Sequence, residues 1–237
     1  MMAEAQILLL TAVSIAFLHT ILGPDHYIVF TAMGKARGWS LSRTLRITLY
    51  CGFGHVFSSV IIGVIGLLLG TQLAALIEIE TLRGNLAGWA LLAFGLMYLA
   101  WGLQQAGRDR RHSHVHTHGG VVHDHEHDHH DEHTHVHDQR ARHSITPWAM
   151  FIVFVFGPCE ALIPLLMYPA AQQSTGLVMS VALVFGAVTL ATMLALVAIT
   201  SVGLDRLKMP VAGRRYAHAI AGASVALCGG AISFMSL

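Results

Sequence analysis

The sequence predicts an all-α membrane protein with six transmembrane helices, arranged as a 3+3 inverted repeat in which the first and fourth helices are broken. Apolar residues make up 54% of the chain and charged residues only 11%, which is far from the composition of a soluble globular domain. Six apolar runs approach or exceed the length of about 20 residues that a hydrocarbon core requires. Gly-Pro pairs interrupt the first and fourth of these runs.

The apolar runs divide the chain into two halves joined by a polar loop. Gly23-Pro24 lies inside the first run, and proline removes a backbone donor and disfavours helical geometry at the preceding residue, so we expect a broken helix there. A cleaved signal peptide is the alternative, but Glu4 and the absence of an early Lys or Arg do not fit one. The runs cover about 5–33, 45–69, 86–105, 147–169, 176–203 and 215–236. The predicted units are a first repeat (1–106), a loop (107–144) and a second repeat (145–237).

Basic residues predict the orientation of the chain in the membrane. Thirteen of the fourteen Lys and Arg residues fall in the loops after the first, third and fifth runs, and only Arg83 falls elsewhere, in the expected loop after the second run beside Glu78 and Glu80. The positive-inside rule therefore predicts an inner-membrane, multi-pass protein with both termini outside and the long loop in the cytoplasm.

The two Gly-Pro segments resemble each other. LGPDHYIVF in the first run and FGPCEALIP in the fourth each place a Gly-Pro pair before two residues that can bind a metal or a proton, Asp25-His26 and Cys159-Glu160. Because three spans separate the two segments, the second half would cross the membrane in the opposite sense, as in the inverted repeats of transporters. A chance match is the alternative, since Gly and Pro are common in membrane helices.

Ionisable residues inside the apolar runs are the candidate metal ligands, because such groups are costly in lipid and usually functional. In an unbroken helix, His19 and His26 would lie about 10.5 Å apart along the axis, so a shared ion requires the Gly-Pro break to shorten this segment. His55 follows Gly54, which permits close helix approach, and Ser58 and Ser59 could support it. The candidate set is His19, Asp25, His26, His55, Cys159 and Glu160.

Each candidate also has a simpler interpretation. His55 could be a packing residue whose ring is satisfied by hydrogen bonds. Glu160 could carry a proton or pair with a histidine, and a protonated Cys159 could simply pack.

The loop between the third and fourth runs holds thirteen of the seventeen histidines, interleaved with Asp and Glu. It has no apolar face that could form a core, so we expect it to be disordered without metal. Imidazoles and carboxylates at this spacing bind divalent first-row metals. A solvated spacer or an expression tag is the alternative. The predicted loop ligands are His112, His114, His116, His118, His123, His125, His127, His129, His130, His133, His135 and His137.

Together these residues resemble the NicO nickel/cobalt transporter family, which is related to UreH-type urease-accessory membrane proteins. The likeness rests on the His19, Asp25, His26 signature, on Gly54-His55, on the Gly-Pro-Cys-Glu segment and on the histidine-rich loop. The resemblance implies transport of Ni²⁺ or Co²⁺, often as efflux. The related nickel/cobalt permeases resemble the chain less well, because they have eight helices and a different ligand spacing.

The sequence thus predicts a transporter and not an enzyme, working by alternating access with Ni²⁺ or Co²⁺ as substrate, Zn²⁺ as a further candidate and no permanently bound cofactor. Expected partners are the lipid bilayer and transition-metal ions, with no nucleic acid; a homo-oligomer is left open. Because metal binds deprotonated ligands, counter-transport of protons is a natural hypothesis.

Other functions are less well matched by the sequence. Nickel uptake, or metal storage by a urease-accessory membrane protein, is the first alternative, and it differs in the direction or fate of the metal. A CcdA-like thiol electron carrier is the second, but it needs a cysteine in each half, and Asp25 stands where the first should be. An anion exporter rests on fold analogy alone, and the acidic residues argue against it.

Overall fold

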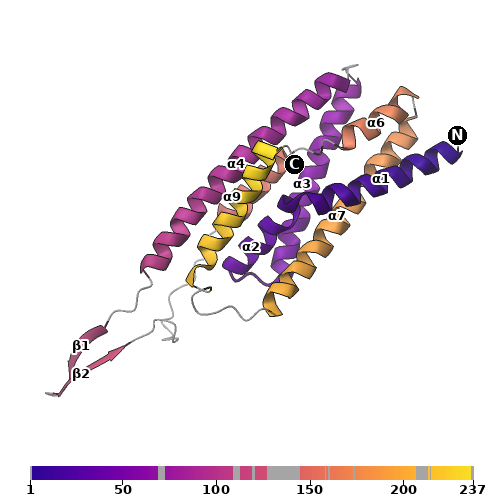
Figure 1. The fold of residues 1–237 in the computed structure, drawn as a ribbon. Coiled ribbons are helices and arrows are strands. Elements are labelled where there is room, and N and C mark those ends of the chain that lie inside the picture. Colours follow the sequence, from indigo (N-terminus) through magenta and orange to yellow (C-terminus); the bar gives the residue numbers. More distant parts are fainter. Residues whose placement is uncertain are drawn as a thin grey trace.

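The structure, a computed structural model, describes residues 2–68, 73–108, 113–118, 121–126, 145–157, 159, 161–172, 174–206, 213 and 215–235. These residues form a helical bundle and one two-stranded hairpin (Figure 1). The helical elements are α1 (Met2–Leu22), the 3-10 turn η1 (Pro24–His26), α2 (Ile28–Ala36), α3 (Leu41–Leu68), α4 (Leu73–Arg108), α5 (Ile145–Phe156), α6 (Leu162–Ala171), α7 (Thr175–Arg206) and α9 (Ala217–Met235). The strands are β1 (Ser113–His118) and β2 (Val121–Glu126).

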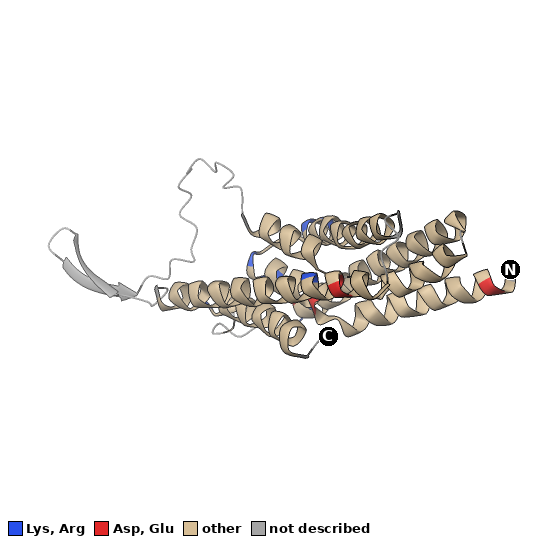
Figure 2. Ribbon diagram, turned by 90° about the horizontal axis from the view of Figure 1, so that it is seen from above, with Lys and Arg blue, Asp and Glu red and all other residues tan. Residues whose placement is uncertain are grey.

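Five helices are long and apolar enough to cross a membrane: α1, α3, α4, α7 and α9. Their outer faces carry large apolar side chains, such as Leu227 and Phe234, which are 74% and 70% exposed. Few charged residues interrupt these helices (Figure 2). A chain with this surface buries its outer apolar side chains only in a lipid bilayer or against partners, so the fold has the character of a multi-pass membrane protein.

The first predicted run, 5–33, forms three elements and not one. Helix α1 ends at Leu22, Gly23 has an extended backbone (φ −85°, ψ 95°), and η1 turns the chain into α2. An extended conformation is what a residue before proline prefers. The amide of His26 donates to the carbonyl oxygen of Gly23 at 3.1 Å, which closes the turn.

The fourth predicted run, 147–169, forms two shorter helices. Helix α5 ends at Phe156 and α6 begins at Leu162, and neither is long enough to cross a membrane by itself. Pro169 lies inside α6 near its end, and because it has no N–H it cannot donate to the carbonyl of Leu165.

The third predicted run begins too late in the sequence, and this boundary is corrected. We expected a span over 86–105, with Arg83, Glu78 and Glu80 in a preceding loop, but α4 begins at Leu73 and contains all three residues. Charges lower the mean hydropathy of this segment, yet Glu80 and Arg83 pair within the helix, one turn apart. The pairing explains why the helix continues through them.

The polar loop also contains structure that the sequence analysis did not predict. Strands β1 and β2 pair antiparallel, with Ser113 opposite Glu126 and His118 opposite Val121. The strict alternation of histidine with other residues in SHVHTH has the period of a strand. Our expectation followed from the lack of a core-forming face, which does not exclude a local hairpin.

Helices α4 and α9 pack along one side of the bundle, and α1 and α7 along another (Figure 1). The contact between α4 and α9 is close because glycines face backbone across it. A Cβ built on Gly95 would lie 2.3 Å from the amide nitrogen of Ala226, and one on Gly222 would lie 2.3 Å from that of Leu99. Small residues let membrane helices approach in this way.

Replacing Gly95 with Ala should therefore lower the stability of the protein. The backbone of α9 has to move to admit the methyl group, which costs roughly 1–3 kcal/mol. The matched control is Gly107→Ala on the same helix, where an added Cβ meets nothing within 4 Å. Thermal unfolding in detergent measures the difference; equal midpoints for the two variants would contradict the close α4–α9 contact.

Candidate metal centre

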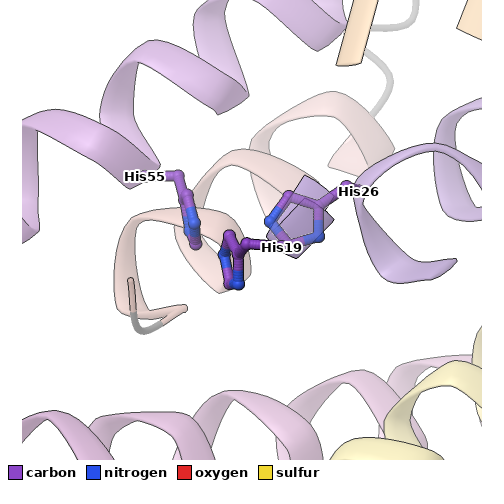
Figure 3. A group of neighbouring side chains, drawn as sticks. All are labelled: His19, His26 and His55. Atoms are coloured by element: carbon purple, nitrogen blue, oxygen red, sulfur yellow. The ribbon is translucent and has the colours of Figure 1, made fainter. Parts of the chain in front are cut away.

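Three histidines from two regions of the chain meet inside the bundle. His19 comes from the last turn of α1, His26 from η1 and His55 from the middle of α3, and their side chains point toward one another (Figure 3). One ring nitrogen from each lies within 4.8 Å of the other two. The ring centroids of His19 and His26 are 4.9 Å apart, and those of His26 and His55 are 5.2 Å apart. The turn at Gly23-Pro24 brings the first two rings together.

The hydrogen bonds of His26 and His55 leave one nitrogen on each ring free. Nδ1 of His26 lies 3.1 Å from the carbonyl oxygen of Gly23, and Nδ1 of His55 lies 3.3 Å from that of Phe154. A carbonyl only accepts, so both Nδ1 atoms carry a proton, and in the neutral imidazole both Nε2 atoms then present a lone pair. Among the described residues, neither buried Nε2 has a hydrogen-bond partner. A metal-binding histidine has this pattern, with its other nitrogen donating to a carbonyl.

Asp25 supports His26 from beside the cluster. Its Oδ1 lies 3.2 Å from Nδ1 of His26, and its side chain is 20% exposed. It stands outside the set of mutually close ligand atoms, which His19, His26 and His55 alone form among the described residues. A carboxylate here orients the His26 ring and adds a negative charge next to the site.

The glycine of each Gly-Pro pair lies against one of the histidines. A Cβ on Gly23 would be 2.5 Å from Nδ1 of His26, and a Cβ on Gly157 would be 3.1 Å from Nδ1 of His55. The His26 ring can therefore keep its place only if residue 23 has no side chain, whereas a Cβ at residue 157 would make a tight contact with the His55 ring.

The site lies between the two apolar clusters of the bundle. Phe185 of one cluster has its ring centroid 6.5 Å from that of His19, and Phe154 of the other lies 6.3 Å from His55. His26 and His55 are 3% and 2% exposed. A polar cluster in such surroundings needs partners for its free nitrogens, because an unsatisfied buried polar group is costly.

The remaining predicted ligands are placed less closely or lie outside the described residues. Cys159 is fully buried, with its Sγ 4.0 Å from Nε2 of His19. Glu160 lies outside the described residues, as do seven of the predicted loop ligands: His112, His127, His129, His130, His133, His135 and His137. For the loop histidines on the strands, the structure describes the backbone but not the side chains: His114, His116, His118, His123 and His125.

Sequence reasoning missed two buried charged residues beside this site, Glu80 and Arg83 on α4. Glu80 is fully buried and Arg83 is 12% exposed, and the two form an ion pair. The signal was available: an acid and a base three residues apart in an otherwise apolar stretch can pair on one face of a helix. We did not predict the pair because we expected both residues to lie in a loop and not in a helix.

The two serines near His55 take part in this network. Oγ of Ser58 donates to the carbonyl oxygen of His55 at 2.9 Å and accepts from Arg83 at 2.8 Å. Oγ of Ser59 donates to Glu80 at 3.1 Å. They support the backbone around the site and not the imidazole rings.

Comparison with known proteins found no matching family model, no matching curated protein and no matching solved structure.

Proposed function

We propose that this protein transports a divalent transition-metal ion, Ni²⁺ or Co²⁺, out of the cytoplasm, and that the ion binds at His19, His26 and His55. The observation that carries the proposal is the group of three ring nitrogens, one from each of His19, His26 and His55, within 4.8 Å of one another. The Nε2 atoms of His26 and His55 are also buried and without a hydrogen-bond partner among the described residues. Lone pairs that converge in an apolar interior need a proton or a cation between them.

The donor set favours late first-row metals. Neutral imidazoles suit Ni²⁺, Co²⁺ and Zn²⁺, whereas Mg²⁺ and Ca²⁺ take oxygen ligands. Metal–imidazole bonds of about 2.0–2.1 Å would place tetrahedral ligand nitrogens about 3.4 Å apart, so limited side-chain movement would close this cluster on an ion. Asp25 would compensate part of the charge of the cation, and Cys159 is near enough to His19 to join with a rotamer change.

The arrangement of helices supports the 3+3 inverted repeat. In that repeat, α1–α2 corresponds to α5–α6, α3 to α7 and α4 to α9. The exchange turns the contact of α1 with α7 into that of α5 and α6 with α3, and both contacts occur. The exchange swaps the two members of the α3–α7 pair and of the α4–α9 pair, so it predicts that each pair is in contact, and both pairs are. The interruptions at 23–27 and 157–161 then fall at equivalent places, as in transporters with discontinuous helices.

Interrupted helices fit a transport site better than a structural metal site. The carbonyls of Gly23 and Phe154 each accept from one of the site histidines as well as from a backbone amide, so the backbone at the two breaks belongs to the site. Irregular backbone at membrane depth is tolerated where it lines a polar cavity or an ion pathway. Movement of one half against the other would change both breaks and open the site to alternate sides.

The histidine-rich loop would collect the ion in the cytoplasm. Its many overlapping imidazole and carboxylate sites give high local capacity without a fixed geometry. Transfer from the loop to the three buried histidines would then commit the ion to export.

Metal retention in cells tests the proposed function. After loading with nickel or cobalt, cells that express the wild-type protein should retain less metal than cells without it. Cells that express Asp25→Asn should retain more metal than cells that express the wild type. The deletion of residues 112–137 should weaken export without abolishing it, because the loop supplies ions and does not form the path. Higher retention with the wild type would contradict export, and loss of function by the loop deletion alone would indicate storage.

Proton coupling has its own test. Because protonated imidazoles cannot bind metal, acid on the outer side should displace the ion and drive turnover. In proteoliposomes, the initial rate of Ni²⁺ flux should therefore rise when a pH gradient, acidic on the outer side, is imposed. A rate that does not change with the gradient would contradict counter-transport of protons.

A further inference from the structure

Glu80 is fully buried and Arg83 is nearly buried, and the two form an ion pair inside the bundle. Removing a charged pair from water costs several kcal/mol per ion, and the loss is recovered only when both partners have further hydrogen bonds. Both residues do: three of these bonds run to the region where α5 ends and α6 begins, and three run to Ser58 and Ser59 on α3.

Arg83 contacts the carboxyl end of α5. Its Nη2 donates to the carbonyl oxygens of Val155 at 2.8 Å and Gly157 at 3.4 Å. The last carbonyls of a helix lack partners within the helix and form the negative end of its dipole. A guanidinium with several donors in a fixed plane satisfies two of them at once.

Glu80 contacts the segment that leads into α6. Its Oε2 accepts from the amide of Cys159 at 3.1 Å, and Oγ of Ser59 accepts from the same amide at 3.2 Å. The carbonyl of Cys159 in turn accepts from the amide of Leu162, the first residue of α6, at 2.9 Å. The start of a helix is the positive end of its dipole, so a carboxylate is favourable there.

The same contacts reach the metal centre. Cys159, which Glu80 holds by its amide, has its Sγ 4.0 Å from Nε2 of His19. Ser58 accepts from Arg83 and donates to the carbonyl oxygen of His55. Phe154, in the turn of α5 that Arg83 caps, provides the carbonyl that fixes the His55 tautomer.

We propose that Glu80 and Arg83 are positioning residues for the metal centre: as a clamp on α4, they hold the two facing helix ends of α5 and α6 and thereby fix His55 and Cys159 relative to His19. That the clamp affects metal binding rests on the proposed function, whereas that it holds the ends of α5 and α6 does not. A pair that merely stabilised α4 would need no particular sign at either position. The clamp needs a cation at position 83, which faces carbonyls, and an anion at position 80, which faces an amide.

The test uses the full-length chain in nanodiscs and proteoliposomes, with Cys51→Ala and Cys228→Ala so that Cys159 is the one thiol. The variants are Arg83→Gln, Glu80→Gln, Arg83→Lys and the charge swap Glu80→Arg/Arg83→Glu. The matched control is Glu78→Gln, an exposed acid on the same helix two residues from Glu80. The two readouts are the rate at which N-ethylmaleimide labels Cys159 and the KM and kcat for Ni²⁺ flux. Thermal unfolding and elution profile show that each variant is folded.

In folded protein, Arg83→Gln and Glu80→Gln should speed the labelling of Cys159 at least about tenfold and raise the KM for Ni²⁺ about 10–100-fold, the usual cost of losing an outer partner of a metal ligand. Arg83→Lys, which keeps the charge but not the planar donors, should fall between these variants and the wild type. Glu78→Gln should behave as the wild type.

The charge swap decides between the clamp and an ordinary ion pair. The clamp predicts that the swapped protein labels as fast as Arg83→Gln and keeps its raised KM. Recovery of wild-type labelling and KM by the swap would overturn the clamp, as would wild-type values in both single variants. If the wild type moved no Ni²⁺, the proposed function would fail, and the labelling rates would still decide the clamp: a rise upholds it and no rise overturns it.

Discussion

Replacing either His26 or His55 with Ala is expected to stop Ni²⁺ transport. Each substitution removes one of three ring nitrogens that lie within 4.8 Å of one another. Loss of an outer partner alone costs up to about 100-fold in metal affinity, so loss of a direct ligand should lower kcat/KM for Ni²⁺ by at least about 100-fold. Each substitution also leaves a cavity, which lowers stability, while the loss of an unpartnered buried nitrogen offsets part of that cost.

Initial rates of Ni²⁺ flux into proteoliposomes measure this effect. The matched control is His218→Ala, since His218 lies at the start of α9, where its Nδ1 is 2.8 Å from the hydroxyl of Tyr98. Flux should be normal in that variant. Wild-type flux in either His26→Ala or His55→Ala would show that the ion passes elsewhere.

The second large effect is expected from a single methyl group. In Gly23→Ala, the new Cβ would lie 2.5 Å from Nδ1 and 2.8 Å from Cε1 of His26, so the ring has to leave its place. Backbone strain is not the cause, because Gly23 has an extended conformation that alanine adopts freely. Displacement of one ligand should lower kcat/KM for Ni²⁺ by at least about tenfold.

The control for Gly23→Ala is Gly107→Ala, at a position where a Cβ meets nothing within 4 Å. Flux and unfolding midpoint are measured for both variants. Reduced flux with a near-normal midpoint in Gly23→Ala supports a displaced ligand. Normal flux in Gly23→Ala would mean that His26 does not need this position to carry the ion.

The sequence singled out His19, His26 and His55 among its six candidate ligands, because ionisable residues in apolar runs have few explanations, and the structure groups these three. His19 and His26 are too far apart in a continuous helix, and the proline between them indicated where the chain would turn. His55 was the least certain of the three, since one histidine on a helix does not reveal which neighbour it faces. The carbonyl of Phe154, ninety-nine residues away, fixes its ring, and such a pairing depends on tertiary packing.

Helix boundaries were harder to predict than the site. The third span was expected from residue 86, because three charged residues before it lower the hydropathy of the segment. Helix α4 nevertheless begins at Leu73, since Glu80 and Arg83 neutralise each other and find further partners on α3 and at the ends of α5 and α6. A composition scan cannot detect partners that come from the other half of the chain.

The measurement that tests the central claim most directly is the metal content of the purified protein after deletion of residues 112–137, which removes twelve of the thirteen loop histidines and leaves the buried cluster. Equilibrium dialysis against Ni²⁺ or Co²⁺ should find one ion per chain, and the same deletion combined with His26→Ala and His55→Ala should bind none. An account based on the buried histidines would be contradicted if the loop-deleted protein bound no metal, or if it bound one ion with and without the two histidines.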